Sequence, residues 1–198
     1  MNSRSQVSSP DGSIRLSRYV TIKKYREMER SQDRQGLAAF IYERLSERYI
    51  KPVTYGKKNG FAIMACASLL IETLECFCRG WKSSNGAGPG EELFHEYFNR
   101  TASFEDLRAF AAGFYYDVRC GILHQGETKN GWKITRSKGM PYFDPKTKTI
   151  QATKFINRLD ASLRDYCHTL ETSRWQEDVW KCYRRKMNAI IQNCVERD

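Results

Sequence analysis

The chain has 198 residues, of which 40% are apolar and 13% aromatic, and this composition excludes wholesale disorder and suffices for one domain with its own core. Lys and Arg outnumber Asp and Glu by 33 to 23, and the net charge of +10 favours a polyanionic partner such as RNA, DNA or an acidic protein. The seven cysteines lack the spacing of a zinc site, and their odd number indicates reduced thiols. The longest apolar run, residues 61–71, is too short to span a membrane. We therefore expect a cytoplasmic protein without metal or cofactor.

The first part of the chain predicts a tail followed by helices. Residues 1–16 are rich in Ser, Arg, Pro and Gly and are expected to form a flexible tail before a single domain at 17–198. Residues 19–34 predict a charged helix, and a clearer amphipathic helix begins at Gly36 and is expected to stop at Pro52. The outward face of this second helix is interpreted as solvated surface, formed by Glu43, Arg44, Glu47 and Arg48.

Residues 58–81 form the most apolar segment, which by its length predicts a helix. Five of its side chains are expected in the core: Phe61, Met64, Ile71, Leu74 and Phe77. A polar line follows helical spacing along the same segment: Ser68, Glu72, Glu75 and Arg79. Because unpaired buried carboxylates are costly, this line faces either solvent or a basic partner. If the partner is basic, we expect Glu72 to pack against the helix that carries Arg119 and to orient the Arg119 guanidinium.

The second half of the chain alternates helices with turns. Residues 82–90 predict a loop and 91–100 a short helix, and Ser103 is a predicted N-cap for the next helix. Apolar side chains recur along that helix at three- and four-residue spacing: Phe104, Leu107, Ala111, Phe114, Val118 and Ile122. Residues 131–151 predict a small β-hairpin or flap, and helices return at 153–166 and 175–195. The sequence therefore predicts a mainly all-α helical bundle with a β-flap insertion and a C-terminal helix.

The predicted flap is both basic and aromatic. Its candidate RNA-binding residues are Lys129, Lys133 and Arg136. Three aromatic residues lie among the basic ones: Trp132, Tyr142 and Phe143. This combination suits single-stranded nucleic acid, whose bases stack and whose phosphates pair with cations. The alternative is a solvated hairpin whose aromatic side chains pack down on the helices.

Two groups with an obvious chemical use lie at the end of the amphipathic helix, where Arg119 is followed five positions later by His124. An arginine offers a permanent charge and a fork of donors for phosphate oxygens, and a histidine exchanges protons near neutral pH. Metal-free cleavage of a phosphodiester needs one group to move protons and one to stabilise the developing charge. Arg119 and His124 are therefore the candidate catalytic pair.

The spacing of this pair limits how it can work. On an ideal α-helix five positions correspond to about 500°, so the two side chains would point about 140° apart and would not converge on one phosphate. Either Gly121 loosens the last turn, or two protomers assemble the working pair. Asp117 lies near His124 on the ideal helical wheel, and Cys120 lies at i, i+4 from His124. Both are candidate supporting residues, together with Glu72.

The Arg119–His124 spacing at the end of a long helix resembles the RxxxxH signature of the HEPN superfamily, and the stretch VRCGILHQGET is similar to plasmid- and phage-associated members. The resemblance is sharp over residues 104–128 and weaker through 36–166. It implies a compact helical bundle and a homodimer in which both motifs meet in a cleft. The family usually has a polar residue after the arginine, whereas this chain has Cys120.

This resemblance implies a metal-independent endoribonuclease of phage-defence or toxin–antitoxin systems. His124 would act as general base or acid and Arg119 would bind the scissile phosphate, giving a 2′,3′-cyclic phosphate and a 5′-hydroxyl. The implied partners are RNA, a second copy of the chain and an antitoxin or regulatory protein. The alternative is a catalytically inactive HEPN-like module that binds RNA, nucleotides or a partner protein. A third class, a DNA-binding regulator, has no helix-turn-helix signature here to favour it.

Overall fold

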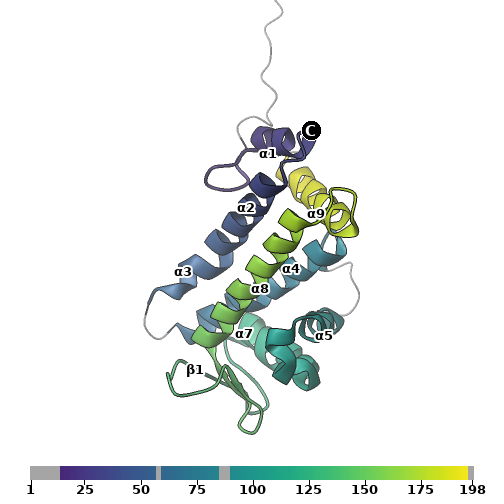
Figure 1. Ribbon diagram of the computed structural model, residues 1–198. Coiled ribbons are helices and arrows are strands. Elements are labelled where there is room, and N and C mark those ends of the chain that lie inside the picture. Colours follow the sequence, from purple (N-terminus) through teal and green to yellow (C-terminus); the bar gives the residue numbers. More distant parts are fainter. Residues whose placement is uncertain (1–13, 57–58, 85–89, 196–198) are drawn as a thin grey trace, which may run out of the picture.

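The computed structural model describes residues 14–56, 59–84 and 90–195 and shows a mainly helical protein with a small mixed sheet (Figure 1). Its α-helices are α1 (Ile22–Arg30), α2 (Arg34–Leu45), α3 (Lys51–Thr54), α4 (Gly60–Arg79), α5 (Gly90–Arg100), α6 (Ala111–Gly113), α7 (Cys120–Gln125), α8 (Ala152–Thr172) and α9 (Asp178–Cys194). Between them lie the 3-10 helix η4 (Ala102–Phe110) and the π-helices η2 (Ser46–Ile50) and η5 (Phe114–Arg119). The predicted mainly helical fold is confirmed.

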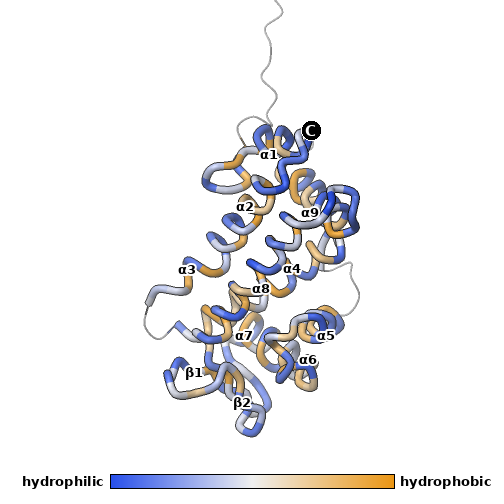
Figure 2. Tube along the Cα trace, viewed as in Figure 1, coloured by the Kyte–Doolittle hydropathy of each residue, from blue (hydrophilic) through white to orange (hydrophobic). Residues whose placement is uncertain are grey.

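The bundle is organised around α8 and α4. Helix α8 packs against α2 and α4, and α4 also packs against α5 and α9. In Figure 1, α2, α8 and α4 run side by side, with α1 and α9 at one end of the bundle and the sheet at the other. Hydrophobic residues, orange in Figure 2, recur along α2, α4 and α7, whereas hydrophilic residues predominate on α1. The core is rich in aromatic rings, among them the stacked pair Phe114 and Phe155, whose centroids lie 5.5 Å apart.

The helix that begins with α2 does not stop at Pro52 as predicted. A proline inside a helix lacks an N–H and crowds the carbonyl four positions earlier, which here belongs to Arg48. The chain widens instead into η2, where the amide of Lys51 donates to the carbonyl of Ser46 five positions back. Helix then continues as α3 to Thr54. The π-turn therefore allows the helix to continue past Pro52.

The predicted tail and the predicted solvated face of α2 both need correction. Leu16 falls within the predicted tail of 1–16, yet it is buried in the core; residues 1–13 lie outside the described part of the chain. Its carbonyl accepts a hydrogen bond from the guanidinium of Arg44. Arg44 was expected to face solvent, but its exposed fraction is 5% because the segment around Leu16 covers it.

By length and composition alone, helix α4 is long and apolar enough to cross a membrane. The apolar run of residues 61–71, from which the sequence predicts no membrane span, is only part of this helix. Within its apolar stretch, 56% of the residues are buried inside the protein, as is typical of the core helix of a soluble protein. Four of the five predicted core residues of α4 are buried, namely Met64, Ile71, Leu74 and Phe77. Phe61 is 38% exposed, because it lies in the first turn of the helix beside the sheet.

Three residues of the polar line of α4, namely Ser68, Glu72 and Glu75, do not face solvent, whereas Arg79 at its end is exposed. Ser68 and Glu75 are fully buried, and the hydroxyl of Ser68 donates to the carbonyl of Met64 at 2.9 Å. The carboxylate of Glu75 accepts hydrogen bonds from Arg79 at 3.0 Å and from Arg100 of α5 at 2.6 Å. A buried carboxylate needs such partners, because an unpaired charge is expensive to desolvate. Of the two alternatives raised by the sequence, the basic partner is correct.

The segment predicted as one helix after Ser103 is a series of different helical turns. It begins as η4, becomes α6, widens into η5 and ends as α7. Phe104 (φ −118°, ψ 22°) and Phe110 (φ −111°, ψ 8°) depart from helical backbone angles. Ser103 therefore lies inside η4 and is not an N-cap, and its carbonyl accepts a hydrogen bond from Arg158 at 2.6 Å.

The insertion is a three-stranded sheet in the order β1 (Lys133–Thr135), β3 (Thr149–Gln151), β2 (Phe143–Asp144). Strands β2 and β3 pair antiparallel, as a hairpin would, but β1 pairs with β3 in parallel. The side chains of Trp132, Tyr142 and Phe143 are buried and contact the rings of Phe104 and Phe110. The predicted hairpin alone is thus incomplete. The alternative in which the aromatic side chains pack on the helices is correct, so these rings are not open to bases.

Replacing Phe114 by Ala is expected to lower the free energy of unfolding by about 3–5 kcal/mol, because a fully buried ring leaves a cavity behind. Phe61→Ala removes the same side chain from a partly exposed position and is expected to cost about 1.5 kcal/mol or less. Urea unfolding followed by circular dichroism measures both variants. Equal losses in the two would contradict the assigned core.

Candidate active site

The candidate site is built on an ion pair between α4 and the segment that carries the RxxxxH motif. The Nε atom of Arg119, the last residue of η5, donates to Oε1 of Glu72 at 2.7 Å. The two side chains are only 19% and 12% exposed. Glu72 therefore packs against the motif segment and orients the guanidinium, as the second of the two sequence alternatives predicted.

Two further groups surround the guanidinium of Arg119. Its Nη1 atom lies 3.9 Å from the thiol sulfur of Cys120, and its central carbon lies 5.7 Å from the ring centroid of Tyr115. Burial lowers the pKa of Arg119, but the hydrogen bond and the charge of Glu72 outweigh it and raise that pKa. The arginine is a permanent cation whose Nε edge is occupied by Glu72.

Tyr115 was not singled out from the sequence. Its four-residue spacing from Arg119 was the available signal, since such pairs share one face of a helix. Burial, followed by the charge of Cys120, raises the pKa of the Tyr115 phenol. The phenol therefore remains a neutral hydrogen-bonding group beside the arginine.

His124 lies near the end of α7 and is exposed to solvent. Within the described ranges its imidazole makes no hydrogen bond or ion pair, so the ring is available to a ligand. Helix α7 is continuous through Gly121, and the chain leaves it only at Gly126, which has a φ of 71°. The first of the two predicted routes to convergence, a last turn loosened at Gly121, is therefore wrong.

A buried glycine allows the chain to fold back after the motif. After Gly126 the backbone returns over α7, and the amide of Glu127 approaches the carbonyl of Gly121 at 3.4 Å. A Cβ atom on Gly121 would lie 2.5 Å from the carbonyl oxygen of Glu127. Only a glycine at this position leaves room for the backbone of residues 127–128.

Asp117 does not support His124 as predicted. Its carboxylate accepts a hydrogen bond from the side-chain amide of Asn130 at 2.8 Å, and its carbonyl accepts one from the amide of Lys129 at 3.0 Å. Asn130 has a φ of 48°, so this side-chain bond holds an uncommon left-handed turn. Asp117 is therefore a structural residue that connects η5 with the turn at residues 129–130, which precedes β1.

The three candidate RNA-binding residues have different surroundings. Arg136 donates to Thr153 at 3.0 Å and to the side chain of Asn59 and the carbonyl of Gly56, so its guanidinium joins three parts of the fold. These acceptors engage Nε and Nη1, so the role of Arg136 in the fold is shown, and its contact with phosphate stays a prediction that would involve Nη2. Lys133 is exposed and Lys129 half-buried, and neither ammonium group forms an ion pair with a described residue.

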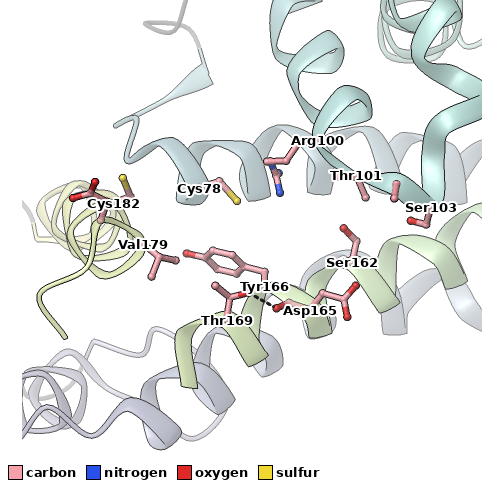
Figure 3. A pocket seen from close by; sticks show the side chains of 12 residues that line it. Cys78, Arg100, Thr101, Ser103, Ser162, Asp165, Tyr166, Thr169, Val179 and Cys182 are labelled. Atoms are coloured by element: carbon pink, nitrogen blue, oxygen red, sulfur yellow. Dashed lines mark hydrogen bonds between the residues drawn. The ribbon is translucent and has the colours of Figure 1, made fainter. Parts of the chain in front are cut away.

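A separate cavity of about 430 Å³ lies between α4, α5, α8 and α9 and includes no residue of the motif. Figure 3 shows the ring of Tyr166 projecting into it, with Cys78 and Cys182 on its hydroxyl side. The Tyr166 hydroxyl is buried and has no hydrogen-bond partner among the described residues. Burial raises the pKa of Cys78 to about 12, so its thiol is protonated and unreactive. This cavity is distinct from the candidate site.

No group of three His, Cys, Asp or Glu residues suited to a metal ion occurs in the part of the chain that the structure describes. No protein-family model, curated protein or solved structure matches the chain. The resemblance to the HEPN signature therefore rests on the residues of the motif.

Replacing Gly121 by Ala is expected to lower the free energy of unfolding by about 1–3 kcal/mol, because the added methyl group meets backbone that cannot move aside cheaply. Gly139→Ala is the matched control, since a Cβ there meets nothing within 4 Å, and it is expected to stay within about 0.5 kcal/mol of the wild type. Thermal and urea unfolding compare the two. A Gly121→Ala protein as stable as the control would contradict the fold-back of residues 126–128.

Proposed function

We propose that this protein is a metal-independent endoribonuclease of the HEPN type, acting in the cytoplasm in phage defence or as a toxin. The ion pair between Glu72 and Arg119 is the observation that supports the proposal most directly. It holds a partly buried guanidinium in one orientation, five positions from a solvent-exposed histidine. Preorganised positive charge of this kind stabilises the negative charge that develops on a phosphate during transfer.

In the proposed reaction His124 removes the proton of a ribose 2′-hydroxyl, or protonates the leaving 5′-oxygen. The 2′-oxygen attacks the adjacent phosphorus, the bond to the 5′-oxygen breaks, and the products are a 2′,3′-cyclic phosphate and a 5′-hydroxyl. Arg119 binds the non-bridging phosphate oxygens through its Nη atoms, because Glu72 occupies Nε. Glu72 is a positioning residue in this scheme, since it acts through the arginine.

We propose that the working site forms between two copies of the chain. Arg119 ends η5 and α7 runs from Cys120; at the 100° per residue of an ideal α-helix, five positions would place the Arg119 and His124 side chains about 140° apart, and Glu72 holds the arginine toward α4. Tyr116 and Leu123, from the same segment, are 52% and 38% exposed and offer apolar surface for a partner helix. In an isologous dimer such a contact brings each arginine toward the histidine of the other protomer.

Two features of this proposal concern other partners. The free ammonium groups of Lys129 and Lys133 follow the motif and would contact the RNA backbone. An antitoxin or regulatory protein would restrain the activity, because uncontrolled cleavage of RNA damages the cell that makes the enzyme.

The second candidate is a catalytically inactive HEPN-like module that binds RNA, nucleotides or a protein. The same ion pair favours it in one respect, because Glu72 already neutralises the charge that a phosphate would engage. Cys120, in place of the usual polar residue, also fits a module that has lost activity. The two candidates differ in a single observable, which is cleavage of bound RNA.

Wild-type protein is expected to cleave single-stranded RNA in EDTA. Arg119→Ala and His124→Ala are each expected to reduce the rate by at least about 10²-fold, because each removes transition-state stabilisation or proton transfer. His168→Ala, an exposed histidine on α8, is the matched control and should retain wild-type activity. Gel analysis of end-labelled RNA reports rates and the cyclic-phosphate ends.

Binding of RNA without cleavage by all four proteins would instead support the inactive module. Full activity of folded His124→Ala protein would remove the proposed mechanism. Circular dichroism of each variant excludes loss of the fold as the cause.

Replacing Glu72 by Gln is expected to lower kcat about tenfold with little change in KM, because the weaker neutral hydrogen bond no longer fixes the guanidinium. Glu92→Gln makes the same charge change at an exposed position of α5 and should leave both constants unchanged. Steady-state kinetics with a fluorogenic RNA separates kcat from KM. An equal response of the two variants would mean that net charge, and not orientation of Arg119, determines the rate.

A further inference from the structure

A second group of cations gathers where η2, α4 and α9 meet. Arg44, Arg48 and Lys186 line a cavity of about 170 Å³, which Tyr49 and Thr73 also line. None of these residues belongs to the RxxxxH motif or to its supporting contacts. The cavity shares only α4 with the candidate active site.

Among residues 14–56, 59–84 and 90–195, the positive charges of this cavity have no acidic counterpart. Arg44 is 95% buried, since its exposed fraction is 5%, and its one described hydrogen bond goes to the neutral carbonyl of Leu16. No described carboxylate lies within ion-pairing distance of Arg44, Arg48 or Lys186. The two glutamates nearest in sequence are bonded elsewhere, Glu43 to the hydroxyl of Ser17 and Glu47 to the amide of Arg18.

Uncompensated charge of this kind is unfavourable in a protein interior. A buried cation is normally paired, because its desolvation costs several kcal/mol that only an opposite charge and hydrogen bonds recover. Burial, followed by the charge of Arg48, lowers the pKa of Arg44 to about 10, and burial, followed by the charge of Arg44, lowers the pKa of Lys186. An anion within the cavity would raise both pKa values by stabilising the charged forms.

We propose that this cavity is a binding site for a phosphate group, either free inorganic phosphate or the terminal phosphate of a monoester. Residues from α2, η2 and α9 that carry hydrogen-bond donors line it: Arg44, Arg48, Tyr49 and Lys186. The Lys186 ammonium gives one hydrogen to the carbonyl of Lys82 at 2.9 Å and keeps two. Guanidinium forks and ammonium groups are the side chains that bind phosphate oxygens in proteins.

The size of the cavity sets what can enter it. A pocket that encloses a drug-sized ligand spans roughly 300–1,000 Å³, and this one is smaller. A phosphate group is therefore enclosed, whereas the remainder of a nucleotide would lie outside. The π-turn η2 supplies Arg48 and Tyr49, and π-turns in helices recur at functional sites.

The test uses the full-length protein and inorganic phosphate, titrated by calorimetry at constant ionic strength against chloride. Wild-type protein is expected to bind saturably, with a rise in Tm that chloride does not produce. The double variant Arg48→Gln/Lys186→Gln should bind at least about tenfold more weakly, because it removes two charged donors. Arg44 is left intact, since its bond to Leu16 also supports the fold.

The matched control is Lys51→Gln/Arg185→Gln, which removes the same charge from two exposed residues near the cavity in sequence, one in α3 and one in α9. It should keep wild-type affinity. A parallel titration with AMP separates the two sources: binding comparable to inorganic phosphate indicates a monoester site, and much weaker binding indicates free phosphate. No saturable binding by the wild type, or equal weakening in both double variants, would overturn the proposal. Neither result bears on RNA cleavage, because no motif residue is changed.

Discussion

The structure depends on two carboxylates that α4 carries among apolar neighbours. Glu75 is fully buried and bonds Arg100 of α5, and Glu72 bonds Arg119 at the end of η5. Leaving either charge unpaired would cost several kcal/mol, so the two pairs fix where α5 and the motif segment lie against α4. The contact that completes this packing is the same one that holds the Arg119 guanidinium in place. The candidate site therefore follows from the charge balance of the central helix.

Sequence reasoning succeeded where one local rule determined the outcome. Apolar spacing located α4, α8 and α9, because each buries a stripe of side chains over many turns. Because a buried carboxylate is costly unless it is paired, the sequence predicts the pairing of Glu72 with Arg119 as one of two alternatives. The buried aromatic side chains of the sheet were likewise one of two stated alternatives. Whether Arg119 and His124 act together in catalysis stays a prediction.

Sequence reasoning failed where a backbone group or a distant segment decided the outcome. Arg44 turns inward because the carbonyl of Leu16 accepts its hydrogen bond, and every residue type has such a carbonyl. Asp117 bonds Asn130 across a turn, which a helical wheel cannot represent. The helix stop expected at Pro52 is absent because η2 accommodates the proline, and such a π-turn has no simple sequence signature. These three corrections concern contacts between elements rather than the elements themselves.

The central claim is that Arg119 of one protomer works with His124 of the other. The direct measurement is metal-free RNA cleavage by an equimolar mixture of Arg119→Ala and His124→Ala proteins after exchange of subunits. Each mixed dimer contains one complete site and one empty site, so the mixture should recover about a quarter of the wild-type rate. A mixture that is no more active than either variant alone, at a composition shown to contain mixed dimers, would contradict the shared site.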